Sequence, residues 1–225
     1  MLRSDTASAF ITTEHEIPGA HSGPSHRLSA AEAALARHSV RVYRDEPVTD
    51  DEIRTLISLT GRAPSAFNLQ PWRFVVVRDQ TTKNQLMAAA HGQKQVGQAP
   101  VVIAMYADME DTMAHLDEVV HPDLDADKKA STIAMLNRNF GGMTPEARAA
   151  WANNQSNIAL GYLLLIAKSE GFDTSPMLGF QADLVKQTLG IPAHATMTAM
   201  VALGRGADHG FRSHRHTVER TTSFR

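Results

Sequence analysis

The stretch Ala63-Pro-Ser-Ala-Phe-Asn-Leu-Gln-Pro-Trp-Arg-Phe74 decides the fold. Two prolines, Pro64 and Pro71, restrict its backbone near both ends. The polar side chains between them, which can bind hydroxyl groups or amide edges, belong to Ser65, Asn68 and Gln70. A plain turn uses the same residue types. Here, however, Gln-Pro-Trp leads directly into an apolar run, which would hold the loop at a rigid edge. We interpret the stretch as a ligand-binding loop that precedes a buried strand.

A second polar motif, Arg37-His-Ser-Val-Arg41, comes earlier in the chain. Alternation places Arg37, Ser39 and Arg41 on one face of an extended segment. Two guanidinium groups beside a hydroxyl make a plausible phosphate site, because arginine offers paired donors to phosphate oxygens. The alternative is a solvated helix end with ordinary surface arginines. Taken together, the two motifs favour a phosphorylated cofactor with a polar tail.

Composition excludes several kinds of protein. The 225 residues carry a formal net charge of -2, which gives no overall attraction to nucleic acid or to an anionic membrane. The chain has no cysteine, so disulfides, thiolate nucleophiles and cysteine-ligated clusters are absent and any redox chemistry needs a cofactor. No apolar run approaches the roughly 20 residues of a membrane helix, and no signal peptide is evident. We expect a cytoplasmic protein.

Periodicity divides the chain into a flexible N-terminal arm, residues 1–27, and a single domain, residues 28–225. A charged, methionine-rich segment at about 108–142 is only weakly periodic, and we expect short helices there that form a flap. The predicted helices are 29–37, 49–61, 82–91, 145–171 and 181–190, and the predicted strands are 74–77, 100–106 and 196–203.

Three strands are few for a sheet in a chain of this length. Either short strands are hidden, at 40–43 and in the tail 206–225, or the sheet borrows a strand from a partner chain.

Other motifs in the sequence do not qualify as cofactor-binding, catalytic or metal-binding sites. Gly204-Arg-Gly206 lacks the third glycine of a dinucleotide fingerprint, and no Walker loop, HExxH or GxSxG sequence occurs. His209, His214 and His216 cluster in the tail without a carboxylate at ligand spacing, so we expect no metal site.

The two polar motifs, about 22 residues apart, resemble the N-terminal signature of the FMN-dependent, NAD(P)H nitroreductase-like family. Further segments resemble the family in the same order: Gly92-Gln-Lys-Gln95, Gly171-Phe-Asp-Thr-Ser-Pro-Met-Leu-Gly-Phe180 and Gly190-Ile-Pro192. This resemblance implies an α+β fold with a central, mostly antiparallel sheet flanked by helices. It also implies an intertwined homodimer that exchanges C-terminal segments and binds FMN at the subunit interface.

The resemblance also assigns roles to residues. The FMN phosphate, ribityl chain and pyrimidine side would contact Arg37, His38, Ser39 and Arg41, with Arg215 of the tail at the phosphate. The opposite subunit would contribute Pro64, Ser65, Ala66 and Asn68, with Gln70 nearby. Ring-lining residues would be Pro176, Met177, Leu178 and Gly179, with a backbone N–H directed at flavin N5, and Gln95 would lie near the ring edge.

Three features of this sequence depart from the family. The family's basic or amide groups near the ring edge are represented here by Gln93 and Gln95. A lysine common two residues before the tail arginine is Ser213 here, which weakens the phosphate site unless Arg212 substitutes for it. An acidic residue common before the turn glycine is Leu178, so only its backbone role survives.

The implied activity is an oxidoreductase that uses NADH or NADPH to reduce nitroaromatic, quinone or similar small-molecule acceptors by ping-pong hydride transfer. The flavin carries this chemistry, so no side-chain nucleophile is expected, and Arg41 would stabilise the charge of the reduced flavin. Alternatives are specialised flavin chemistry in the same fold, such as flavin fragmentation or dehalogenation, and a non-catalytic flavin-binding protein. A helical dimer with solvated arginines is the simplest alternative. The acceptor and the choice between NADH and NADPH are left open.

Overall fold

The computed structural model describes residues 27–208, 210–211 and 213–225. The described residues do not include residues 1–26 of the predicted arm, His209 of the tail histidines, or Arg212, the candidate substitute for the tail lysine. The division into an arm and a single domain stays a prediction.

A four-stranded antiparallel sheet forms the centre of the fold. Its strands are β1 (Trp72–Val77), β2 (Val101–Ala107), β3 (Asp173–Met177) and β4 (Thr196–Gly204). Their order across the sheet is β1-β2-β4-β3, and every neighbouring pair is antiparallel. The apolar residues of β2 and β4 are buried on both faces, as expected for central strands covered by helices. The predicted α+β class is therefore confirmed.

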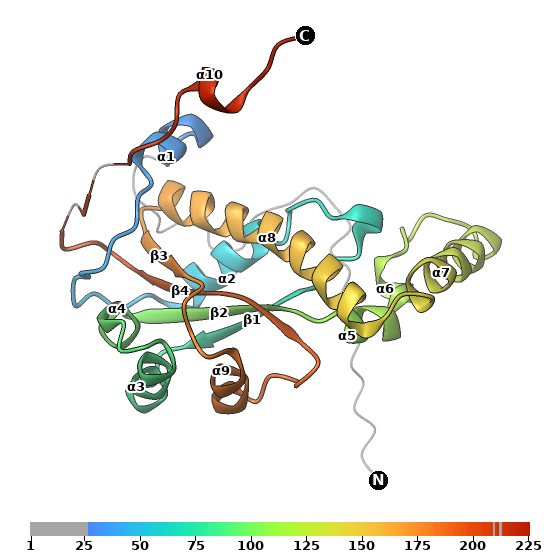
Figure 1. Cartoon of the computed structure of the whole chain (residues 1–225), viewed down its shortest axis with the longest axis horizontal. Helices are drawn as coiled ribbons and strands as arrows, with labels where there is room; N and C mark the ends of the chain where they lie inside the picture. Colours follow the sequence, from blue (N-terminus) through green and yellow to red (C-terminus); the bar gives the residue numbers. More distant parts are fainter. Residues whose placement is uncertain (1–26, 209, 212) are drawn as a thin grey trace.

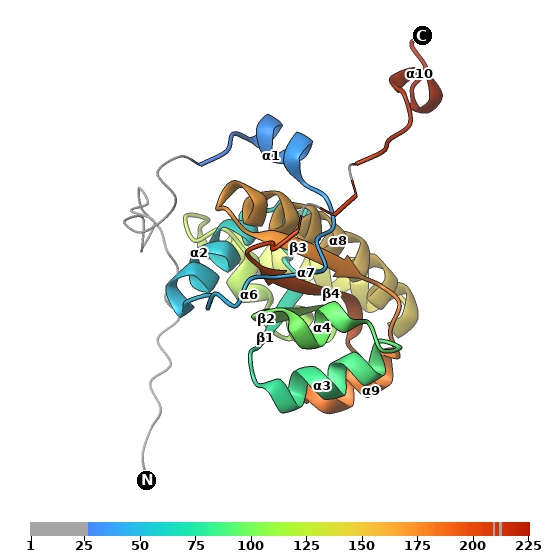
Figure 2. The ribbon, with the colours of Figure 1, turned by 90° about the vertical axis from the view of Figure 1, so that its left-hand side faces the viewer.

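Helices cover both faces of this sheet (Figure 1). On one face lie α2 (Asp50–Thr60) and the long α8 (Pro145–Ser169), with α1 (Ala30–Ala36) against α8. On the other lie α3 (Gln80–Ala89), α4 (Lys94–Gln98) and α9 (Ala182–Leu189), as the rotated view also shows (Figure 2). Each face buries its own hydrophobic cluster, so the sheet is a rigid support for the loops at its corners.

Three further helices form the flap region beyond the end of β2: α5 (Met109–Ala114), α6 (Leu116–Val119) and α7 (Ala126–Gly141) (Figure 1). The 16 residues of α7 make it longer than the short helices predicted there. The Asp125 carboxylate caps its N-terminus, and Leu136 and Phe140 are buried in a third cluster. Tertiary packing therefore stabilises a helix whose own periodicity is weak.

The predicted positions of the hidden strands were wrong. Strand β3 lies at 173–177, and among the described residues the 40–43 segment and the tail make only isolated bridges, Ser39 with Thr174 and Tyr43 with Gly206. The short helix α4 was also not predicted. A one-turn 3₁₀ helix, η1 (Ala66–Asn68), and a C-terminal helix, α10 (Val218–Thr221), complete the described elements.

Of the described helices, none combines the length and apolar character that crossing a bilayer requires. The C-terminal tail runs outward from the sheet in both views (Figures 1 and 2).

Candidate functional site

The loop before β1 has an unusual backbone. Phe67, Asn68 and Gln70 have φ angles of 57°, 58° and 43°, and they are three of the four non-glycine residues with positive φ in the described chain. Each left-handed residue of this kind costs of the order of 1 kcal/mol, and such strain concentrates at ligand-binding and catalytic sites. The structure therefore singles out the same loop that the sequence indicated.

Hydrogen bonds from three sides hold this loop in place. The Gln70 backbone N–H donates to the Ser65 hydroxyl at 3.0 Å, inside the loop. The Ala66 N–H donates to the amide oxygen of Gln155 on α8 at 3.0 Å, and the Asn68 amide donates to the Val119 carbonyl of the flap at 3.3 Å. These contacts offset the backbone strain and connect the loop to both helical elements.

A cavity of about 1160 Å³ lies between the loop and the flap. The loop side contributes Pro64, Asn68 and Gln70 of the predicted site, together with Phe67. Its flap side includes His115, Glu118, Val119, His121 and Leu136. The wall is therefore partly apolar and partly polar, which is the character of a small-molecule site.

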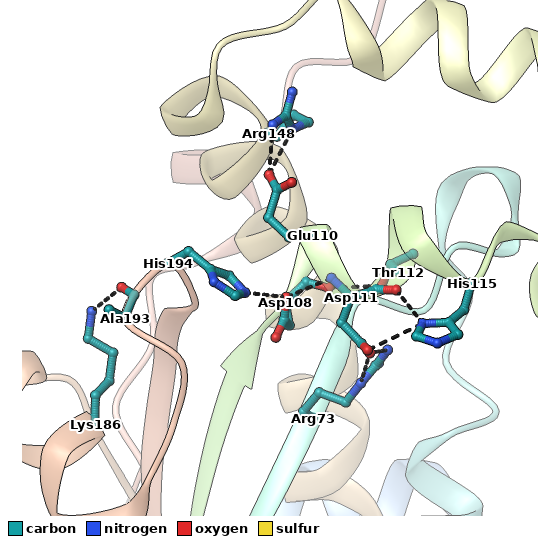
Figure 3. A network of polar contacts seen from close by, with 10 residues as sticks. All are labelled: Arg73, Asp108, Glu110, Asp111, Thr112, His115, Arg148, Lys186, Ala193 and His194. Atoms are coloured by element: carbon teal, nitrogen blue, oxygen red, sulfur yellow. Dashed lines mark hydrogen bonds and ion pairs between the residues drawn. The ribbon is translucent and has the colours of Figure 1, made fainter.

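A polar network anchors the first flap helix to the sheet (Figure 3). The Arg73 guanidinium of β1 donates to the Asp111 carboxylate at 2.5 Å, and the Nε2 atom of His194 lies 3.0 Å from the buried Asp108 carboxylate. A third contact joins Arg148 of α8 to Glu110 at 2.8 Å. Because the three contacts approach α5 from β1, the loop before β4 and α8, the cavity has a fixed wall on this side.

The other predicted motif lies at the β3 edge of the sheet. Ser39 bridges Thr174 of β3, and the Ser213 hydroxyl of the tail donates to the Arg37 carbonyl at 3.0 Å. Burial and the nearby Arg215 guanidinium both lower the pKa of Arg37. Within the described residues neither arginine forms an ion pair with a carboxylate. Two cations held close together in this way suit a bound anion.

His38 completes this corner. Its Nδ1 atom lies 2.9 Å from the Ala36 carbonyl, which can only accept, so Nδ1 carries the proton. The Nε2 atom is buried and has no hydrogen-bond partner in the structure. Gly210 of the tail, with φ +51°, packs so closely that a Cβ there would lie 2.9 Å from the Ser39 carbonyl oxygen. A buried, unsatisfied nitrogen beside two arginines fits a ligand that brings its own hydrogen-bonding groups.

The predicted ring-lining turn follows β3 on the same side of the sheet. Pro176 and the buried Met177 end the strand, and Leu178 is 72% exposed. The Gln93 amide donates to the Gly179 carbonyl at 2.9 Å. A second amide, Gln95, donates to the Gln93 oxygen at 3.1 Å and lies 3.4 Å from the Met177 sulfur. These two side chains, which the resemblance places near the ring edge, fix the turn.

One chain does not bring all the predicted residues together. Strand β3 and the Arg37 corner occupy one edge of the sheet, whereas the 63–72 loop opens β1 at the other edge. Across the sheet, Thr174 of β3 lies in line with Val101 at one end of β2, whereas Trp72 of β1 pairs with Ala107 at the other end. Three strand spacings and this six-residue offset separate the two groups by roughly 24 Å.

Some residues in these sites gave no sequence signal. Phe67 stands inside the recognised loop, but its left-handed backbone contradicts the preference of phenylalanine. The Arg73–Asp111 and Asp108–His194 contacts join residues 38 and 86 positions apart, and no local pattern announces them. In the described part of the chain, no group of three or more His, Cys, Asp or Glu side chains is placed to hold a metal ion.

Comparison with known proteins is consistent with this geometry. A protein of Thermus thermophilus named NADH dehydrogenase is 49% identical over 88% of this chain and 97% of its own length. YdgI of Bacillus subtilis, provisionally named an NAD(P)H nitroreductase, is 26% identical over 84% of this chain and 93% of its own. A structure from Exiguobacterium sibiricum, provisionally named a nitroreductase and solved in complex with FMN, superposes with a TM-score of 0.80 at 23% identity. It covers 89% of this chain and 99% of its own.

The sequence profile of the nitroreductase family matches residues 34–205, which include the Arg37 motif, the 63–72 loop and all four strands. The chain belongs to the nitroreductase family.

Proposed function

We propose that this chain is an FMN-dependent oxidoreductase that uses NADH or NADPH to reduce a small organic acceptor. The family assignment, the T. thermophilus relative named NADH dehydrogenase and the FMN complex of the E. sibiricum structure all support it. Ping-pong hydride transfer, with a nitroaromatic, a quinone or a similar molecule as acceptor, is the reaction we expect.

The observation that carries the proposal is the corner of Arg37, His38 and Arg215. Two guanidinium groups without a carboxylate partner in the described chain suit the FMN phosphate. The buried Nε2 lone pair of His38 suits a hydroxyl donor such as a ribityl group. FMN offers both groups in one molecule, and the E. sibiricum structure was solved in complex with it.

Bound FMN would supply hydride acceptance and donation, and the side chains would hold and polarise it. Arg41 is exposed near this corner, where its charge would stabilise a reduced flavin. The Gln93 amide fixes the Gly179 carbonyl, and the Gly179 N–H has no acceptor among the hydrogen bonds of the described chain. That N–H is therefore available to flavin N5.

The separation of the two motifs supports a homodimer as part of this proposal. A second copy related by two-fold symmetry would place its 63–72 loop against the Arg37 corner of the first, and the exchange would be reciprocal. The long helix α8 exposes Ile158, Tyr162 and Leu165, which supply an apolar contact surface. The end of the tail beyond Arg215, which is exposed and carries Phe224, is the segment we expect to cross to the partner.

The test is the absorbance spectrum of the purified protein, before and after anaerobic addition of NADH and, separately, NADPH. We expect an FMN spectrum that bleaches with at least one nucleotide and returns when a quinone is added. Flavin that stays oxidised with both would favour a flavin carrier or specialised flavin chemistry. Failure to bind added FMN would refute the proposal.

A further inference from the structure

Phe67 is an aromatic residue in a conformation that few aromatic residues adopt. Its φ of 57° lies in the left-handed region, where a bulky side chain is a true outlier. Phe67 as a residue is 51% exposed, so burial of apolar surface does not explain why the loop tolerates the strain. Strain retained without burial is typical of a residue that contacts a ligand.

One aromatic ring contacts Phe67, and a second ring supports the first from behind. The Phe140 ring of α7 meets it edge to face, with centroids 6.1 Å apart and planes at 86°. Phe140 is itself buried and packs against Trp151 of α8 with centroids 4.8 Å apart. The exposed ring is thus braced from the flap and from the helix behind it rather than left free to rotate.

The braced ring forms part of the wall of the 1160 Å³ cavity. Other parts of the wall are apolar, including Leu69, Val119 and Leu136. Aromatic rings attract other rings in stacked or edge-to-face geometry beyond what buried area alone provides. A flat aromatic molecule therefore gains more from this wall than a saturated molecule of equal size.

We infer that Phe67 determines the acceptor class of this enzyme, selecting planar aromatic molecules over saturated ones. The inference rests on the proposed function, since the cavity becomes an acceptor site when a partner chain supplies the flavin corner beside the loop. It concerns the part of the cavity wall that would contact the acceptor, and it makes no claim about the strength of FMN binding.

The experiment compares two ligands that the enzyme cannot reduce, benzoate and cyclohexanecarboxylate, which share charge and approximate size. Each is titrated into the oxidised, FMN-loaded full chain and followed by the change in flavin absorbance. We expect benzoate to bind about two- to tenfold more tightly. Phe67→Leu should abolish the preference, whereas Phe67→Tyr should retain it. Leu184→Ala, an exposed position on α9, serves as the matched surface control.

Three outcomes would overturn the inference. The native protein could bind both ligands equally, a result that needs no variant to fold. Phe67→Leu could keep the benzoate preference, which would mean that another part of the cavity wall causes the preference. Phe67→Leu could release FMN, which would assign the ring to the flavin site. If the native protein binds no FMN, the proposed function fails separately, and the two ligands are compared by tryptophan fluorescence, to which Trp72 of the cavity wall contributes together with Trp151.

Discussion

At the scale of single residues, the strongest feature is a pair of like charges. Arg37 and Arg215 come together although they lie 178 positions apart in the chain, and burial and mutual repulsion depress the pKa of Arg37. A folded protein retains such a pair when a bound anion compensates for it. The arginine pair is thus less favourable without a ligand than with one.

We predict that Arg37→Met lowers affinity for FMN by at least about tenfold, because charge-assisted hydrogen bonds to the phosphate are lost. Affinity for riboflavin, which lacks the phosphate, should change much less. The flavin-free protein should be no less stable, since removing one cation relieves repulsion. Fluorescence titration and thermal melting measure these quantities, with Arg54→Met, an exposed arginine of α2, as control. An equal loss for both flavins would contradict the phosphate assignment.

His115 of the flap carries a second residue-scale prediction. Its hydrogen bond to the Asp111 carbonyl, followed by the charges of Asp111 and Glu118, raises the pKa of His115 above its ordinary value of about 6.5. The protonated form is therefore favoured in the folded flap. The resulting stabilisation is present at acidic pH and is lost as the pH rises through the raised pKa.

An NMR titration of His115 should therefore give a midpoint above that of a free histidine. Asp111→Asn should lower the midpoint only in part, because the backbone carbonyl remains. A midpoint below the ordinary value in the native protein would contradict the contact.

At the scale of elements, capping explains why the helix predictions succeeded. Thr49 and Glu52 form a complete capping box at the start of α2, and Thr144 with Pro145 begins α8. Gly190, in the left-handed conformation, ends α9. These are local signals between residues a few positions apart, and a sequence displays them directly.

Strand β3 and the shape of the 63–72 loop could not be predicted in the same way. Asp173-Thr-Ser-Pro-Met177 has almost no apolar alternation, and it pairs as an edge strand, where Pro176 is tolerated. Its partner β4 begins 19 residues after β3 ends. The left-handed Phe67 is held by α7 and α8, so its conformation comes from tertiary contacts that no local pattern contains.

For α2, we predict that Glu52→Ala destabilises the protein by about 1–2 kcal/mol, lowering the melting temperature by roughly 2–8 °C. The carboxylate accepts from the Thr49 N–H at 2.8 Å and from Arg205 at 2.8 Å. Burial alone would raise the pKa of Glu52, but these hydrogen bonds outweigh it and the pKa is lowered.

Because that pKa is depressed, the stabilisation is present above about pH 4 and is lost as the pH falls through the folded-state value. Melting curves of the native protein and Glu52→Ala should therefore differ at pH 7 and converge in acid. Asp51→Ala, exposed in the same helical turn, should have a much smaller effect. Equal effects of the two substitutions would mean that the capping box contributes little.

At the scale of the whole molecule, the sequence indicated the two motifs of the candidate site but not the distance between them. The sequence left two explanations for the shortage of strands, a hidden strand within the chain or a strand borrowed from a partner chain. Strand β3 is a hidden strand within the chain. The exchanged C-terminal segment stays a prediction, supported by the exposed tail. The roughly 24 Å between the two motifs now argues for two chains, because the sheet between them is fully paired and rigid.

This arrangement makes a prediction for mixed dimers. Arg37→Ala and Asn68→Ala should each impair FMN-dependent turnover as a pure homodimer. If every site takes Arg37 from one chain and Asn68 from the other, a mixed dimer has one site with both substitutions and one with neither. Unfolding and refolding the two variants together at equal concentration should then restore about one quarter of the native sites.

The control is the double variant, carrying both substitutions in one chain, refolded with the native chain. Each of its mixed dimers holds one substitution per site, so the mixed dimers, which are half of all dimers, have no intact site, and about one quarter of all sites stay native. Sites built within one chain would reverse this pattern: the two single variants would not restore activity, and each mixed dimer of the double variant would keep one native site. Counting intact sites by bound FMN and by turnover therefore distinguishes a site shared between chains from one that each chain forms alone.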